Sequence, residues 1–438
     1  MRESDINAFY ADPEKLESDK YLVLKYYLET VINPREAIAQ LCQEMSTAQW
    51  SRVGVDEDFR PKYGAKIVDL EILDKPTKPS IPFLANLLKK EFNRIYAVNA
   101  VIYYPYENFG KKIPNLLTAV CGEGVFHAPN ICAIRLMDID FPSSFLADFQ
   151  GPQFGVQGIR DILKVYDRPI FLGVIKPNVG LPPEPFSEIA YEAWLGGLDI
   201  AKDDEQLSDV NWSSVRERSY RLGVLRKRAE SETGEKKIYL TNITDEVDRL
   251  IELHDIAVTN GANAVMVNGM TTGFSAIRML RKHARVPIFS HLDFMAPFIQ
   301  LPYFGVRDLV FTKIQRMAGY DALIYPGFDT RMKATKEDVI ANANACLEPM
   351  GNLKPILPIP AGSQWAGSLK PIFEMLNTID FGIVPGRAVF NHPMGPKGGA
   401  KSLHQGWEAL VRGLPLDDYA KTHEELKVAL DSNQHKSS

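Results

Sequence analysis

Short apolar segments alternate with amphipathic segments along this chain, and from Gly151 onward the alternation is regular. The apolar segments predict strands at Arg168–Lys176, Leu198–Asp204, Lys237–Thr244, Ala264–Asn268, Val286–His291, Ala322–Gly327, Lys354–Gly362 and Phe381–Gly386. A helical pattern follows each strand, at residues 184–194, 212–230, 245–260, 274–284, 306–319, 335–347, 367–377 and 396–412. Eight successive βα units favour a closed (β/α)8 TIM barrel. A doubly wound open sheet is the alternative, but no GxGxxG follows the first strand.

The N-terminal third mixes strands and helices in a different order. Extended segments are expected at Tyr21–Thr30, Ala65–Leu73, Ile95–Tyr104 and Ile131–Phe141, with helices at Ile32–Ala48 and Ile81–Arg94. This order predicts a smaller α+β domain of ferredoxin-like type, with a mixed sheet covered by helices. We therefore expect an N-terminal domain over residues 1–147, and a barrel with C-terminal helices over residues 148–438.

Composition excludes several classes of protein. A net charge of −5 over 438 residues gives no basic surface for nucleic acid or anionic membranes. The N-terminal residues are polar, and no apolar run approaches the roughly 18 residues of a membrane span, so a cytoplasmic protein is expected. The cysteines lack metal-binding spacing and indicate buried thiols in a reducing compartment; they are Cys42, Cys121, Cys132 and Cys346.

The segment GGLDIAKDDE, residues 196–205, concentrates candidate chemistry at the end of the second barrel strand. Strand alternation places Lys202 and Asp204 on one side, and Glu205 lies where the strand opens into a loop. Two carboxylates at this spacing suit a magnesium ion. Lys202 cannot bind a cation as an ammonium group, so it is a counter-charge, a base or a modified residue. A solvated acidic turn is the alternative interpretation.

Other strand ends carry further candidates. Lys176 ends the first strand and is a candidate general base, or else a lysine that reaches solvent from the barrel rim. His291 either hydrogen-bonds a substrate oxygen or is a satisfied rim histidine. The ends of strands seven and eight have the glycines and donors of a phosphate site, although tight turns would explain the glycines equally; these residues are Gly362, Ser363, Gly386 and Arg387.

Over nearly its whole length the chain resembles the large subunit of the ribulose-bisphosphate carboxylase (RuBisCO) superfamily. The GGLDIAKDDE segment is similar to its metal motif, which implies that CO2 carbamylates Lys202 and that Mg²⁺ binds there with Asp204 and Glu205. GVIKPNVG resembles the motif whose lysine, here Lys176, removes a proton next to a carbonyl. FSHLDF resembles the segment of the strand-five histidine, His291, and FGIVPGRAVFNHPMGP resembles the phosphate loop.

The resemblance also implies a shared active site. STAQW at residues 46–50, together with Glu44, resembles the N-terminal loop that completes the active site of a neighbouring subunit. Glu44, Thr47 and Trp50 are therefore expected to serve the partner of a homodimer, because their loop is expected to lie too far from its own barrel mouth.

Several positions depart from the carboxylase pattern. A second lysine is replaced by Asn178, a predicted substrate-binding residue, and a phosphate-binding arginine is replaced by Leu292. The strand-six histidine is Tyr325, and the serine of the strand-seven loop falls at Ala361, with Ser363 displaced. The asparagine of an N-terminal loop is replaced within Gly122-Glu123-Gly124, and the mobile loop after strand six lacks its lysine or displaces it to Lys333.

This pattern resembles the form IV branch, the RuBisCO-like proteins that do not fix CO2. It implies an Mg²⁺-dependent enolase, isomerase or decarboxylase (lyase) acting on a phosphorylated keto-sugar through an enediolate, in sulfur or sugar-acid metabolism. Two alternatives stay open. One is a true ribulose-bisphosphate carboxylase, and the other is a non-catalytic regulatory homologue.

Overall fold

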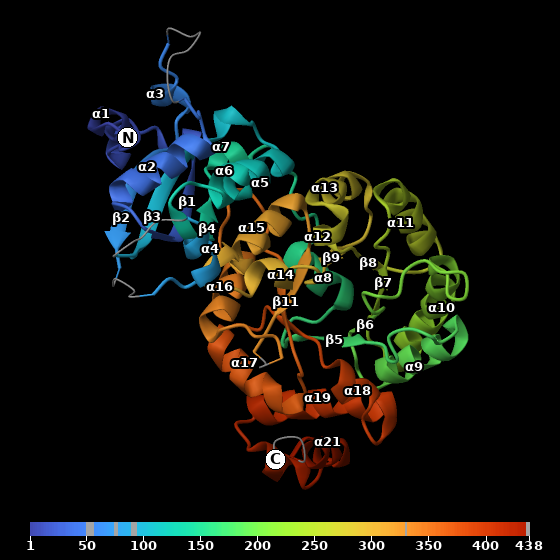
Figure 1. Ribbon diagram of the computed structural model, residues 1–438. Helices are drawn as coiled ribbons and strands as arrows, with labels where there is room; N and C mark the ends of the chain where they lie inside the picture. The colour runs from blue at the N-terminus through green and yellow to red at the C-terminus, as the bar shows by residue number, and fades with distance from the viewer. Residues whose placement is uncertain (50–56, 74–77, 89–93, 329–330, 435–438) are drawn as a thin grey trace. The chain divides into compact units, whose positions relative to one another are not determined.

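The chain folds into two compact units, Met1–Gln150 with Met295–Ile314, and Gly151–Phe294 with Gln315–Ser438. The computed structural model describes residues 1–49, 57–73, 78–88, 94–328 and 331–434 (Figure 1). Within these residues, no helix has both the length and the apolar composition that crossing a lipid bilayer requires. The division expected after residue 147 stays a prediction.

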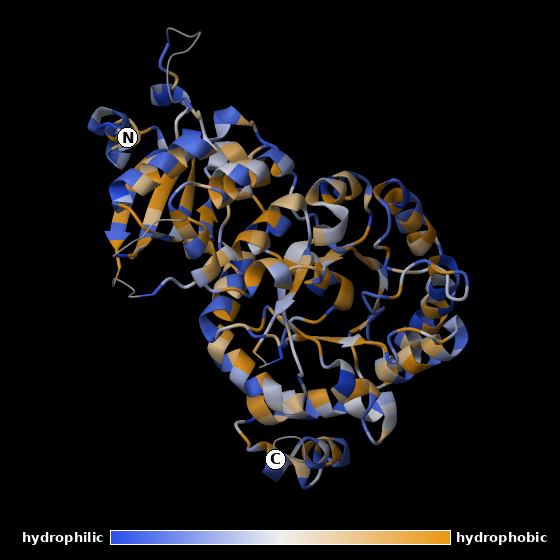
Figure 2. Ribbon diagram, viewed as in Figure 1, coloured by the Kyte–Doolittle hydropathy of each residue, from blue (hydrophilic) through white to orange (hydrophobic). Residues whose placement is uncertain are grey.

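The first unit contains a five-stranded sheet with the strand order β10-β4-β1-β3-β2. Its strands are β1 (Tyr21–Thr30), β2 (Lys66–Ile72), β3 (Tyr96–Pro105), β4 (Ile131–Asp140) and β10 (Phe304–Val306). β1 pairs antiparallel with β3 and β4, and its buried residues alternate from Leu22 to Leu28. The helices of this unit include α2 (Pro34–Met45), α4 (Pro82–Leu87), α5 (Ile113–Cys121) and α6 (Glu123–Phe126). Figure 2 shows mostly apolar colour along the central strands.

Strand β10 is the part of this sheet that no sequence pattern predicted. It pairs parallel with β4 over Phe304–Val306. These three residues lie in no longer apolar segment, unlike the barrel strands of the same length, and Val306 was expected to begin a helix over residues 306–319. The helix expected at Ile81–Arg94 ends at Leu87 in α4, and residues 89–93 lie outside the described part of the chain.

The second unit is a nearly closed barrel of eight parallel strands, ordered β12-β11-β9-β8-β7-β6-β5-β13, which confirms the predicted fold class. The strands are β5 (Ile170–Val174), β6 (Ile200–Lys202), β7 (Ile238–Asn242), β8 (Ala264–Met266), β9 (Ile288–Ser290), β11 (Ala322–Pro326), β12 (Leu357–Ala361) and β13 (Gly382–Ile383). Each lies within a predicted strand. Chain order is kept around the barrel, so the open-sheet alternative is wrong.

Helices follow the barrel strands, as predicted. They are α9 (Pro183–Leu195), α10 (Val215–Thr233), α11 (Leu250–Thr259), α13 (Phe274–His283), α15 (Asp308–Ala318), α16 (Lys336–Leu347), α17 (Leu369–Leu376) and α19 (Gly395–Val411). In Figure 1, α9, α10 and α11 lie outside the strands β5 to β8. Two short helices, α12 (Gly269–Thr272) and α18 (Gly386–Phe390), begin soon after β8 and β13, and α21 (Glu424–Gln434) comes near the C-terminus.

Apolar side chains fill the barrel interior in layers. Residues of seven barrel strands, all except β13, form one buried cluster, which includes Ile170 and Leu172 on β5, Ile200 on β6 and Phe289 on β9. Val156, Ile159 and Leu163 of helix α8 (Gly155–Leu163) belong to the same cluster. Because side chains alternate along a strand, Lys202 and His291 are the next inward positions on β6 and β9, and Lys176 is the inward position after Val174 on β5. The interior therefore changes from apolar to polar at the carboxyl ends of the strands.

The four cysteines are free thiols. Cys42, Cys132 and Cys346 are buried, as predicted, but Cys121 at the end of α5 is only half-buried. The prediction of four buried thiols is therefore wrong for Cys121. The amphipathic pattern of α5 leaves this residue at the edge of the buried face.

Candidate active site

A cavity of about 970 Å³ opens at the carboxyl ends of the barrel strands. Every residue of this unit that was predicted for catalysis, metal binding or phosphate binding lines it; these are Lys176, Asn178, Lys202, Asp204, Glu205, His291, Gly362, Ser363, Gly386 and Arg387. The apolar residues Val174, Ile324 and Val384 line other parts of its wall. The cavity thus combines charged groups with an apolar surface, as binding sites for small molecules commonly do.

The end of β6 presents one lysine and two carboxylates to the cavity. Lys202 is fully buried, and its Nζ donates to Glu205 Oε2 at 3.2 Å and to the Asp203 carbonyl at 2.7 Å. Burial raises the pKa of Glu205, but the charges of Lys202 and His291 outweigh burial and lower that pKa to about 2. Glu205 is therefore ionised at neutral pH. The two carboxylates and a carbamate oxygen on Lys202 would fit a magnesium ion, which prefers oxygen ligands.

Lys176 reaches the same group of acids from β5. Its Nζ donates to Asp204 Oδ2 at 3.1 Å and also to Asn178 Oδ1. The Lys176 side chain is 26% exposed, whereas that of Asp204 is 1% exposed. Lys176 is thus the accessible member of the pair. Asn178 was predicted to bind substrate. In this structure its Oδ1 accepts a hydrogen bond from Lys176.

Asp203 points away from the cavity, as strand alternation requires. Its hydrogen bonds and its ion pair hold the carboxyl end of β6 in place. Its carboxylate accepts hydrogen bonds from Tyr239 (2.8 Å), Thr241 (2.9 Å) and the Asn242 backbone N–H (3.1 Å). Arg218 Nε lies 3.2 Å from the same carboxylate, and both side chains of this ion pair are fully buried. Arg218 also donates to the Ser208 and Ser213 carbonyls in the loop after β6. This network holds the segment that carries Lys202, Asp204 and Glu205.

We expect Asp203→Asn to destabilise the protein by about 3–5 kcal/mol, because it leaves the buried Arg218 guanidinium without its counter-charge. Urea unfolding at neutral pH would measure the loss. Glu217→Gln is the matched control, since Glu217 forms a half-exposed pair with Arg221 within α10 and its loss should cost below about 1 kcal/mol. Equal stability of the two variants would contradict this role of Asp203.

His291 on the β9 end lies between two carboxylates. Its Nε2 is 3.3 Å from Glu205 Oε2, and its Nδ1 is 3.4 Å from Asp293 Oδ2. The Nδ1 atom is buried and has no hydrogen-bond partner in the described structure. His291 therefore has a carboxylate near each ring nitrogen, and both interpretations of the sequence stay predictions. Asp293 lines the cavity but was not singled out from the sequence.

The predicted phosphate residues lie together on another side of the cavity. Arg387 Nη2 donates to Ser363 Oγ at 3.3 Å, and both residues line the wall. Gly386 begins α18, and Gly362 follows β12 with a φ of +156°, a backbone conformation that favours glycine. These two strand ends meet because β12 and β13 close the barrel. A guanidinium, a hydroxyl and backbone N–H groups can together bind a phosphate.

Among the cavity residues that were not predicted, two lie away from the strand ends. Arg331 comes from the segment after β11, and Asn433 comes from α21 near the C-terminus. Neither follows a barrel strand directly, so the rule that places chemistry at strand ends cannot find them. Of the positions noted as departures, Leu292 and Ala361 line the cavity. Tyr325 instead donates to the Val339 carbonyl at 3.2 Å, on the outer side of β11.

The predicted partner-subunit loop belongs to the first unit. Glu44 lines a smaller cavity of about 360 Å³ together with Tyr104, Asn115 and Glu123. Thr47 follows the end of α2 and is half-buried. Trp50 lies outside the described residues. The role of these three residues stays a prediction.

Comparisons with known proteins agree over the whole chain. The family model of the ribulose bisphosphate carboxylase large chain, catalytic domain, matches residues 155–433, and that of its N-terminal domain matches residues 9–145. A ribulose bisphosphate carboxylase-like protein of Allochromatium vinosum is 56% identical over 430 residues, which are 98% of this chain and 93% of that protein.

Solved structures show the same relationship. An octameric ribulose-1,5-bisphosphate carboxylase/oxygenase from Pyrococcus horikoshii aligns with a TM-score of 0.87 and 30% identity, over 98% of this chain and 97% of that chain. A dimeric archaeal Rubisco from Hyperthermus butylicus aligns with a TM-score of 0.84 and 28% identity, over 97% and 99% of the two chains. The chain therefore belongs to the ribulose bisphosphate carboxylase large-chain family, among its RuBisCO-like members.

Proposed function

We propose that this chain is a magnesium-dependent enzyme that removes a proton from the carbon next to the carbonyl of a monophosphorylated keto-sugar. The observation that carries the proposal is the convergence of Lys176, the Lys202–Asp204–Glu205 group and the Ser363–Arg387 pair on one cavity. Proton removal requires a base that accepts the proton and a positive charge that stabilises the oxygen as it becomes negative. It also requires residues that bind and orient the rest of the substrate. The cavity offers one group of residues for each task.

Each group has a defined part in this scheme. Ser363 and Arg387 bind the phosphate and so orient the reacting carbon towards β5. Lys176, in its neutral form, accepts the proton at Nζ. Lys202 as a carbamate, with Asp204 and Glu205, would hold a magnesium ion. When bound, the ion would supply positive charge that stabilises the developing negative charge. Val174 and Ile324 exclude water from the apolar side of the cavity.

Several features support a reaction other than CO2 fixation. Asn178 and Leu292 stand where the carboxylase pattern has a lysine and an arginine, and Lys333 is exposed rather than part of the cavity wall. Among the described residues we therefore recognise one phosphate-binding group, which is Ser363 and Arg387. Enolisation, isomerisation and decarboxylation of a β-keto acid all pass through the same enediolate, and a place in sulfur or sugar-acid metabolism would suit any of them.

The test is proton exchange, because it detects the shared first step without knowledge of the product. The protein is incubated in D2O with Mg²⁺, bicarbonate and a panel of ketose monophosphates, and loss of the α-proton signal is followed by NMR. We expect exchange with at least one monophosphate. Exchange with none of them by a folded, metal-binding protein would favour the regulatory homologue. Incorporation of labelled bicarbonate into ribulose bisphosphate would favour the carboxylase.

We further propose a homodimer in which the Glu44 loop of one subunit completes the active site of the other. The oligomeric state of the related enzymes from Pyrococcus horikoshii and Hyperthermus butylicus supports this arrangement. Inactive Lys202→Met and Glu44→Gln variants, mixed and allowed to exchange subunits, should then recover about a quarter of the wild-type rate, since half the dimers carry one intact site. An active monomer in light scattering would contradict the proposal.

A further inference from the structure

One ring nitrogen of His291, in the cavity, forms no hydrogen bond although a carboxylate lies near it. The His291 side chain is only 9% exposed, and its Nδ1 atom is buried without a hydrogen bond in the described structure. An imidazole that leaves a buried nitrogen unpaired loses the free energy of solvating that atom. A buried polar atom of this kind needs an explanation, and a ligand that binds there provides one.

Two carboxylates flank this imidazole. One oxygen from each of Glu205 and Asp293 and one ring nitrogen of His291 lie within 4.8 Å of one another. The shortest separations involve different ring nitrogens: Nε2 lies 3.3 Å from Glu205 Oε2, and Nδ1 lies 3.4 Å from Asp293 Oδ2. An ion binds only one of these nitrogens, so the carboxylate beside the other nitrogen must turn towards the ion. Ligand atoms bonded to one transition-metal ion at about 2.1 Å lie roughly 3–4 Å apart. Asp293 is 42% exposed, so its side chain has room to turn towards the ion.

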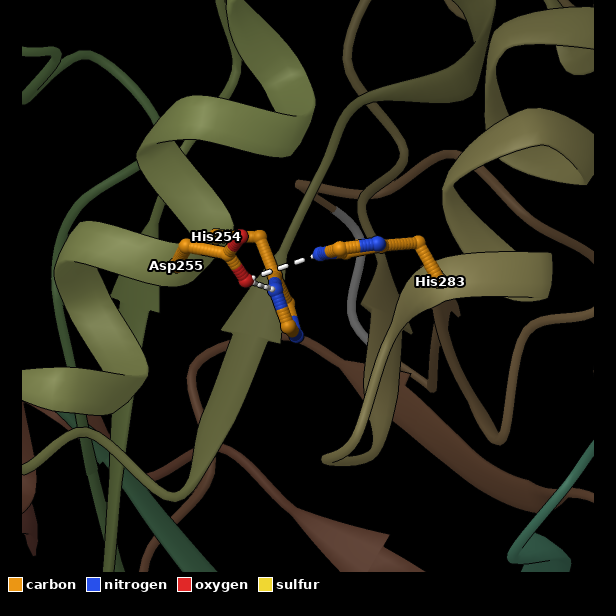
Figure 3. Close-up of side chains that lie close together, drawn as sticks. All are labelled: His254, Asp255 and His283. Carbon is orange, nitrogen blue, oxygen red and sulfur yellow. Dashed lines mark hydrogen bonds and ion pairs between the residues drawn. The ribbon is translucent and has the colours of Figure 1, made fainter.

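A second group with the same residue types has its hydrogen bonds satisfied. Figure 3 shows His254, Asp255 and His283, whose donor atoms also lie within 4.8 Å of one another. Here the Arg285 backbone N–H donates to His254 Nε2 at 3.2 Å, so His254 Nδ1 carries the proton that it shares with Asp255 at 3.0 Å. Asp255 also pairs with the Arg285 guanidinium at 3.2 Å. A cation would have to displace this guanidinium and a proton.

No such competitor protects Asp293. In the described parts of the chain, neither a lysine nor an arginine pairs with it, whereas Lys176 contacts Asp204 and Lys202 contacts Glu205. Before carbamylation, the group of Lys202, Asp204 and Glu205 therefore has ammonium groups on both carboxylates. In the other group, of Glu205, His291 and Asp293, only Glu205 contacts an ammonium group, that of Lys202.

We propose that Glu205, His291 and Asp293 form a second divalent-cation site in the cavity, which binds without carbamylation of Lys202. One imidazole nitrogen and two carboxylates favour a transition-metal ion such as Mn²⁺ or Zn²⁺ over Mg²⁺, which prefers oxygen ligands alone. Because Glu205 belongs to both groups, the two sites adjoin. The site does not depend on the proposed reaction, since it is defined by binding.

Mn²⁺ alone is the probe. The full-length protein is titrated with Mn²⁺ in buffer free of CO2 and bicarbonate, and binding is followed by loss of the free-ion signal in electron paramagnetic resonance. We expect wild-type protein to bind Mn²⁺ and to show ¹⁴N modulation in the electron spin echo, which reports an imidazole ligand. Asp293→Asn should weaken binding at least about tenfold, because it replaces an anionic ligand with a neutral amide.

Two further variants separate the alternatives. Lys202→Met should bind Mn²⁺ at least as tightly as wild type, because it removes the ammonium group beside Glu205. Asp255→Asn makes the same acid-to-amide change in the cluster of Figure 3, and it should leave the affinity unchanged. Loss of binding in Lys202→Met, loss in Asp255→Asn or absence of ¹⁴N modulation would each overturn the site. A normal thermal unfolding midpoint for Asp293→Asn shows that its loss of affinity is not a loss of folding.

Failure of this site and failure of the proposed reaction remain distinguishable. Proton exchange with Mg²⁺ and bicarbonate tests the reaction and does not require a Mn²⁺ site. A protein that exchanges α-protons but shows no CO2-independent Mn²⁺ binding would keep the proposed function and overturn the second site. Anomalous diffraction from a crystal soaked in Mn²⁺ without CO2 would locate the ion directly.

Discussion

Lys176→Met is expected to slow α-proton exchange by about 100- to 10,000-fold, the range that a general base contributes. Methionine keeps most of the volume of the side chain but cannot accept a proton. Lys176 is the accessible amine of the cavity, because its side chain is 26% exposed while Lys202 is fully buried. Proton exchange into D2O, measured at saturating substrate, reports this step without contributions from later ones.

The specificity of this effect rests on two comparisons. Lys370→Met makes the same change on the exposed face of α17, where the lysine lies 3.8 Å from Glu374, and it should leave exchange unaltered. Magnesium binding should persist in Lys176→Met, since Lys176 is not a proposed ligand. If exchange continued at the wild-type rate, another group would have to be the base, and His291 would be the next candidate.

Lys202→Met should lower the same exchange rate by at least about 1,000-fold. The variant cannot form a carbamate, so the magnesium ion loses a ligand and the developing negative charge loses stabilisation of several kcal/mol. A loss of about 4 kcal/mol corresponds to that factor. Activation of the wild-type enzyme by bicarbonate should also disappear, because the carbamate carbon comes from CO2.

Carbon-13 NMR provides an independent measurement of this change. Wild-type protein incubated with ¹³C-bicarbonate and Mg²⁺ should show a carbamate signal that is absent from Lys202→Met. Lys176→Met should retain the signal, and so it serves as a control for the other cavity lysine. A Lys202→Met variant that still exchanged protons at the wild-type rate would show that the reaction does not need this lysine.

The architecture of the second unit could be predicted from local patterns. Each barrel strand lies within a predicted apolar segment, and each predicted helix overlaps an observed one, because a buried parallel strand and an amphipathic helix both leave strong periodic signals over their lengths. Short elements outside such segments were missed. Strand β10 has three residues and α18 has five, whereas the equally short barrel strands β6, β8 and β9 lie inside longer apolar segments.

Much of the candidate site could be predicted for the same reason. Lys176, Lys202 and His291 continue the inward-facing series of β5, β6 and β9, so alternation along the strand places them at the polar end of the barrel. The outward direction of Asp203 follows from the same rule, and its pairing with Arg218 explains why an acidic residue occupies that position.

Local periodicity decides which way a strand residue points, and chain order decides which strand ends are neighbours. The sequence by itself therefore determined the barrel, its polar end and the residues of that end that lie in register with the strands. It left open what each of these side chains contacts. Only the tertiary structure brought Arg331 and Asn433 to the cavity. These residues lie in the segment after β11 and on a C-terminal helix. Their positions depend on packing between segments distant in sequence, which no local pattern records.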